Sequence, residues 1–111
     1  MMNIRINHKE YTVPELGFKD MVYIEDMGFS VLDLFQKQKF FSLAVAFTAV
    51  CVGCGKEEAE KICEQHVLGG GSLEELCQQI MKLVEESGFF KKLLRGTQKN
   101  QEKEDAPTEN K

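Results

Sequence analysis

The chain opens with two short runs in which apolar and polar residues alternate. Ile4 and Ile6 alternate with polar neighbours, as do Tyr11 and Val13, and the polar Asn7-His8-Lys9 separates the two runs. A period of two places the apolar side chains of a strand on one face. Two such runs around a short polar turn predict a β-hairpin over residues 4–13. Because an isolated hairpin is only marginally stable in water, its apolar face should pack on the rest of the protein.

After Pro14 the apolar period lengthens to that of a helix. Glycines, capping serines and breaks in the period divide this part of the chain into segments. The predicted helices cover Phe18–Met27, Ser30–Phe35, Phe40–Val52, Lys56–Leu68 and Ser72–Glu86, and a final apolar turn covers Phe89–Leu94. Ser72 and Glu75 have the spacing of a capping box, in which each side chain bonds the other residue's backbone N–H. Gly69-Gly70-Gly71 before them predicts a helix stop and a flexible link.

Three helices have predicted core faces. Phe40–Val52 is apolar nearly all round, which is typical of a helix surrounded on several sides, so we place it at the centre of the domain. The predicted core face of Lys56–Leu68 consists of Ala59, Ile62, Cys63, His66 and Val67. The predicted core face of the last long helix consists of Leu73, Leu76, Cys77, Ile80, Met81 and Val84.

Composition changes near the end of the chain. From Gly96 to Lys111 no aliphatic or aromatic side chain is larger than that of Ala106, so this segment cannot bury enough apolar surface to offset the entropy of ordering. We therefore predict one domain over residues 1–95 and a disordered polar tail over residues 96–111. The predicted fold is mostly α, formally α+β, with a short N-terminal hairpin packed on a bundle of about four to five helices.

Charge and hydropathy exclude two kinds of partner. The net charge of the chain is −4, and removing the −1 of the tail leaves −3 on the domain, whereas nucleic-acid binding needs a positive surface. No apolar run approaches the roughly 20 residues that span a bilayer, and the N-terminus lacks the apolar core of a secretory signal. We expect a cytoplasmic protein that binds neither nucleic acid nor membrane, with its four cysteines as reduced thiols.

One group of residues resembles a metal site. Cys51 and Cys54 form a C-x-x-C pair and Cys63 and His66 a C-x-x-H pair, a set that could offer zinc three sulfurs and one nitrogen. Their positions on apolar helix faces favour simple packing, because a buried cysteine behaves as a small hydrophobe. A redox role is disfavoured, since the C-x-x-C falls at a helix C-terminus, where the helix dipole raises a thiol pKa. We predict no metal and no cofactor.

No residue set predicts catalysis. The glycines before Ser72 lack the preceding strand and the lysine of a phosphate-binding loop, and adjacent glutamates on helices are typical of solvated faces. We therefore do not expect an enzyme.

The last apolar turn allows two interpretations. Phe89, Phe90, Leu93 and Leu94 either fold back and close the core or stay partly exposed as a docking patch for a partner. These four residues are the predicted partner-binding site.

Several segments together resemble a known family. They are Ile4–Val13, with the pattern I-x-I-x-x-K-E-Y-T-V, the Glu25–Gly28 helix end, the central apolar helix, the Gly70–Leu76 helix start and the Glu86–Phe90 ending. Over residues 2–95 the chain resembles the tail assembly chaperones of long-tailed bacteriophages and prophages of Firmicutes. Members have Asn-Gly in the hairpin where this chain has Asn7-His8, which leaves the turn type open.

The resemblance implies a non-catalytic protein made in the cytoplasm of the bacterial host and not retained in the virion. Its implied partners are the tape-measure protein, which it coats, and the tail-tube protein, whose assembly it assists. We also expect weak, concentration-dependent homo-oligomers. Two alternatives stay open at this point: a small zinc- or thiol-dependent regulator that uses the Cys/His set, and a helical adaptor unrelated to phage.

Overall fold

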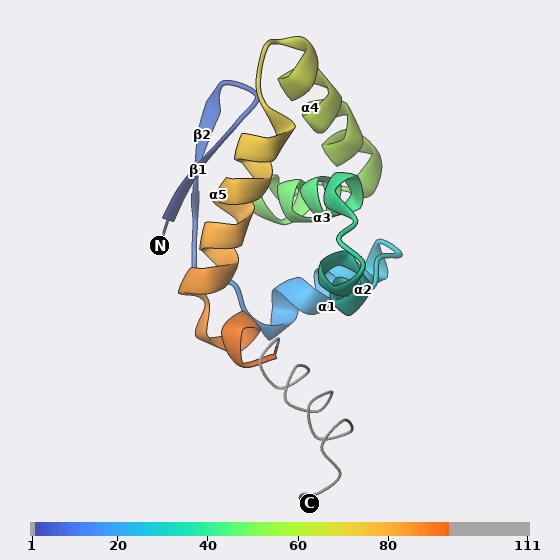
Figure 1. The fold of residues 1–111 in the computed structure, drawn as a ribbon, viewed down its shortest axis with the longest axis vertical. Coiled ribbons are helices and arrows are strands. Elements are labelled where there is room, and N and C mark those ends of the chain that lie inside the picture. Colours follow the sequence, from blue (N-terminus) through green and yellow to red (C-terminus); the bar gives the residue numbers. More distant parts are fainter. Residues whose placement is uncertain (1, 94–111) are drawn as a thin grey trace, which may run out of the picture.

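The computed structural model describes residues 2–93 and confirms a mostly helical protein with an N-terminal hairpin. The elements follow in the order β1 (Met2–Ile6), β2 (Lys9–Val13), α1 (Phe18–Asp26), α2 (Val31–Gln36), α3 (Phe40–Val52), α4 (Lys56–Leu68) and α5 (Leu73–Glu86). Residues 88–93 form one further helical turn. Figure 1 shows the hairpin alongside α5, with α3 crossing behind α5. The tail predicted to be disordered, residues 96–111, lies outside the described residues.

The hairpin has a two-residue turn. Ile6 pairs with Lys9, and both residues between them have positive φ, 51° for Asn7 and 67° for His8. Two consecutive positive φ values are those of a type I′ turn, whose twist matches that of the flanking strands. The turn left open by the sequence is therefore the tight kind that Asn-Gly usually forms.

A glutamine of α5 satisfies the free edge of β1. The Gln79 amide oxygen accepts from the Arg5 backbone N–H at 2.9 Å, and its NH₂ group donates to the Arg5 carbonyl at 3.0 Å. Because Gln79 supplies a donor and an acceptor together, it pairs the exposed strand edge as a neighbouring strand would. Beside it, Ile4 and Ile6 are buried in the core, as the alternation predicted.

Helix α3 lies at the centre of the core, as predicted, but its first turn does not. Phe47 is fully buried, and its ring meets the rings of Phe35 and Phe90 edge to face, each with centroids 6.0 Å apart. In contrast, Phe40 and Phe41 are 53% and 78% exposed. The first turn of α3 therefore leaves both rings largely open to solvent.

The predicted core faces of α4 and α5 need correction at a few positions. In α5, Leu83 is buried, whereas Met81 is 36% exposed. In α4, Ala59 and Cys63 are buried and the half-buried Ile62 packs against the core, as predicted, but Val67 is 48% exposed. The hairpin, α3 and α5 cover only part of α4, so the outer part of its apolar stripe faces solvent.

The three glycines after α4 form an ordered turn rather than a flexible link. Gly70 has φ +94°, its N–H bonds the Val67 carbonyl at 3.1 Å, and the Gly71 N–H bonds the His66 carbonyl at 2.8 Å. This pair of bonds is a Schellman motif, which uses glycine at the left-handed position. Of the capping box predicted next, the structure has the bond in which Ser72 Oγ accepts from the Glu75 N–H, at 3.1 Å.

The break after α5 is tied to the loop between β2 and α1. Ser87 is fully buried, its hydroxyl donates to the Leu16 carbonyl at 2.7 Å, and the same oxygen accepts from the Phe90 N–H at 3.1 Å. The Gly88 N–H bonds a Glu15 carboxylate oxygen at 3.0 Å. Since buried polar groups need partners, these bonds fix where the final helical turn starts.

Candidate functional site: an apolar groove along α5

The predicted partner-binding residues lie partly in the core. Phe90 is fully buried, which corrects the expectation that its side chain is open to a partner. Phe89 is half-buried and meets Phe90 edge to face, with ring centroids 5.7 Å apart. Leu93 is half-buried, and Leu94 lies outside the described residues. The structure thus brings Phe89 and Phe90 together as a closure of the core, and a docking role for this group stays a prediction.

Two residues of the hypothetical zinc site, Cys63 and His66, have other hydrogen-bond partners. His66 Nδ1 accepts from the Asn7 N–H at 2.8 Å, so the ring proton is on Nε2, which lies 3.2 Å from the Ser72 carbonyl. The Cys63 thiol donates to Thr48 Oγ1 at 3.4 Å. Within residues 2–93 no group of three or more His, Cys, Asp or Glu side chains is arranged to hold a metal ion. His66 instead joins the hairpin turn to the start of α5.

Burial keeps the thiols protonated. It raises the pKa of Cys51 to about 12, with a smaller contribution from the Asp20 carboxylate. Burial also raises the pKa of Cys54, Cys63 and Cys77, and the Thr48 hydrogen bond offsets part of the effect at Cys63. Because the thiolate is the nucleophile and the metal ligand, raised pKa values disfavour both uses.

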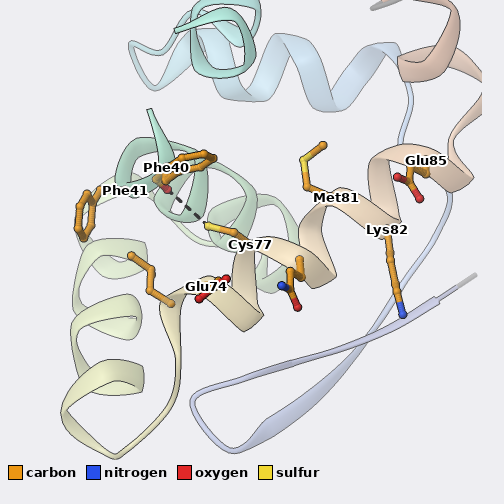
Figure 2. A pocket seen from close by; sticks show the side chains of 9 residues that line it. Phe40, Phe41, Glu74, Cys77, Met81, Lys82 and Glu85 are labelled. Atoms are coloured by element: carbon orange, nitrogen blue, oxygen red, sulfur yellow. Dashed lines mark hydrogen bonds between the residues drawn. The ribbon is translucent and has the colours of Figure 1, made fainter. Parts of the chain in front are cut away.

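The described surface has a groove of about 790 Å³ between the start of α3 and the outer face of α5. Phe40 and Phe41 of α3 form one wall, as Figure 2 shows. Seven α5 residues form the rest, namely Leu73, Glu74, Cys77, Gln78, Met81, Lys82 and Glu85. These seven residues have helical spacing and therefore share one face of α5 over most of its length. We call this feature the α5 groove.

The floor of the α5 groove is apolar and held in place. Leu73, Cys77 and Met81 follow one another at intervals of four along α5. The Cys77 thiol donates to the Phe40 carbonyl at 3.7 Å, the contact dashed in Figure 2, and so joins α5 to the first turn of α3. Sulfur hydrogen bonds are weak, but this one is largely shielded because Cys77 is only 9% exposed.

A second hollow extends the groove toward α4. It measures about 270 Å³, and it shares Phe41 and Leu73 with the α5 groove. Val45 of α3 and Val67 of α4 add apolar surface there. The apolar surface of the groove thus continues over three helices.

The sequence contained a signal for this surface that its interpretation missed. Phe40 and Phe41 follow directly after the four polar residues 36–39 at a helix start, where neighbouring elements rarely cover the whole circumference. Leu73, Cys77 and Met81 lie at the edge of the core face of α5, where Cys77 is buried, Leu73 is half-buried and Met81 is exposed.

Comparison with protein-family models, with curated proteins and with solved structures finds no match to this chain. A search of the described residues finds no single helix long and apolar enough to cross a membrane. Only α3 and α4 taken together meet those criteria, and the chain bends by 108° between them.

Proposed function

We propose that this protein is a tail assembly chaperone of a long-tailed bacteriophage or prophage, and that its α5 groove binds helices of the tape-measure protein. The observation that carries the helix-binding part is the exposed apolar groove. The identity of the partner rests on the family resemblance of the sequence segments Ile4–Val13 and Gly70–Leu76.

The shape of the groove suits a helix. From Leu73 to Glu85 the lining follows α5 for about 18 Å, at about 1.5 Å per residue. An amphipathic helix of about three turns has this length and presents an apolar stripe at the spacing that a groove floor accepts. Phe40 and Phe41 are suited as anchors, because an aromatic ring buries much area at little cost in conformational entropy.

The modest size of the groove agrees with a transient role. A contact of about three helical turns is small beside the interfaces of permanent complexes. A protein that coats an elongated partner in many copies, and leaves before the tail is complete, needs weak and reversible contacts of this kind. In this proposal the protein acts without catalysis in the cytoplasm of the host, together with the tape-measure and tail-tube proteins.

A binding experiment with matched variants tests this proposal. The groove variant combines Phe41→Ser with Met81→Ser, at two exposed positions of the lining. The control is Phe18→Ser, an equally apolar side chain that is 66% exposed on α1, outside the lining of the groove. Each full-length protein is mixed with purified fragments of the tape-measure protein encoded beside it, and capture is compared at equal concentration.

We expect the groove variant to lose most of its capture while its circular dichroism spectrum and melting temperature stay close to the parent's. The Phe18→Ser control should bind as the parent does. Full capture by a folded groove variant would contradict the proposal. Loss of capture in the control instead would move the site to the surface of α1 and Phe89, close to the partner-binding residues predicted from the sequence. A very long helical reading frame directly downstream would support the family assignment independently.

A further inference from the structure

Acidic side chains are among the residues that line the α5 groove and the hollow that extends it. Glu74 and Glu85 belong to the groove, and Glu60 and Glu64 to the hollow. Lys82 is the only basic residue among the residues that line the two features, so their combined formal charge is −3. In Figure 2 the Lys82 side chain extends away from Phe40 and Met81, toward the hairpin.

These carboxylates have no ion-pair partners among the described residues. Over residues 2–93 the structure has one ion pair, between Lys37 and Asp33, 3.7 Å apart on α2 and its end. Glu60, Glu64, Glu74 and Glu85 are all exposed. They are therefore available to a partner without the loss of an internal ion pair.

We infer that the helix which occupies the α5 groove carries lysine or arginine residues on both sides of its apolar stripe. This inference rests on the proposed function and adds the charge of the partner to it. An apolar floor determines that some amphipathic helix binds, whereas charges at the rim determine which helices are attracted and which are repelled. Single exposed ion pairs contribute little, but several carboxylates around one groove act together.

The same charges make a second copy of this chain a poor occupant. The groove-lining face of α5, which carries Glu74 and Glu85, is the face that another copy would present to the groove. Two such faces would bring carboxylates of like sign together around an apolar contact, which is destabilising. The acidic side chains of the two linings thus favour a basic partner helix over a second copy of this chain as the occupant of the groove.

Two synthetic peptides of about 18 residues provide the test. They share one leucine and methionine stripe at helical spacing and differ in the flanking positions, which are lysine in one peptide and glutamate in the other. Binding to the full-length protein is measured by fluorescence anisotropy of labelled peptide in low and high salt. The Debye length falls from about 10 Å at 0.1 M salt to about 3 Å at 1 M.

We expect the lysine peptide to bind about tenfold more tightly at low salt and the difference to shrink to about twofold at high salt. The rim variant, which combines Glu60→Gln, Glu64→Gln, Glu74→Gln and Glu85→Gln, should bind both peptides equally. The control combines Glu10→Gln, Glu25→Gln, Asp26→Asn and Glu57→Gln, which changes the net charge equally at exposed positions outside the two linings. It should keep the preference.

Equal binding of the two peptides to the parent, absence of binding by both, or loss of preference in the control would overturn the inference. The tape-measure fragments distinguish this failure from failure of the proposed function. If the rim variant captures those fragments as well as the parent does, while Phe41→Ser with Met81→Ser does not, the charge inference is wrong and the groove remains the binding site. If the groove variant also captures them fully, the proposed function of the groove is wrong.

Discussion

Replacing Phe90 with alanine decides whether the last apolar turn closes the core or serves a partner. Phe90 is fully buried, and its ring meets Phe47 and Phe89 edge to face at centroid distances of 6.0 and 5.7 Å. Truncation of a buried phenylalanine costs about 3–5 kcal/mol, because transfer free energy is lost and a cavity remains. The aromatic pairs contribute roughly 0.5–1.5 kcal/mol each within that sum.

The size of this effect is large beside the stability of the protein. A domain of about 90 residues has an unfolding free energy of roughly 5–14 kcal/mol. At about 4–8 °C per kcal/mol, the Phe90→Ala variant should melt roughly 12–40 °C below the parent. The matched control is Phe41→Ala, which truncates a ring that is 78% exposed and should change stability by about 0.5 kcal/mol or less.

Urea unfolding followed by far-UV circular dichroism measures both variants, since the chain contains no tryptophan for a fluorescence signal. The reasoning is refuted if Phe90→Ala costs less than about 1 kcal/mol, or if Phe41→Ala is equally damaging. In the first case the final turn contributes little to the core and becomes a free candidate for docking. In the second, the wall of the α5 groove supports the fold, and loss of binding by groove variants would need a different explanation.

Three further predictions concern other parts of the structure. Burial raises the pKa of Cys51 to about 12, above the usual value of 9.0, so the folded state holds this proton more tightly than the unfolded state does. Its contribution to the free energy of unfolding should be complete below about pH 9 and should fall as the pH rises toward 12. Over that pH range, the urea stability of Cys51→Ala should fall less than that of the parent. Reaction of Cys51 with iodoacetamide in the folded protein at pH 8 would contradict the raised pKa. A Cβ on Gly71 would lie 2.5 Å from His66 Nε2. Gly71→Ala should therefore lower the free energy of unfolding by about 1–3 kcal/mol in the parent and by clearly less in a His66→Ala background. Equal losses in the two backgrounds would contradict the close contact. Gln38 has φ +53°, a left-handed conformation that glycine adopts at lower cost than glutamine. Gln38→Gly should therefore raise the free energy of unfolding, measured from the urea midpoint, by about 0.5–1 kcal/mol. A lower midpoint would show that the left-handed conformation costs little there.

Local signals in the sequence determined where the elements begin and end. The helices predicted at Phe40–Val52 and Lys56–Leu68 have those bounds in the structure. Gly53 and Gly70, which follow their C-terminal ends, have φ values of +81° and +94°, a conformation that other residues avoid. The hairpin followed from alternation alone, and the start of α5 followed from Ser72, whose side chain caps it. These features depend on residues a few positions apart, so the sequence carries them directly.

The exposed face of each helix was decided only by tertiary structure. Periodicity gives the angle of each side chain around the helix axis, but it does not say which neighbour covers that angle. In α5 the positions of the hairpin and α3 send Leu83 into the core and leave Met81 in the groove. In the same way, a uniformly apolar α3 could not show that Phe41 is the ring left uncovered. The α5 groove therefore exists because α3 and α5, far apart in the sequence, leave Phe40, Phe41 and Met81 exposed where the two helices meet.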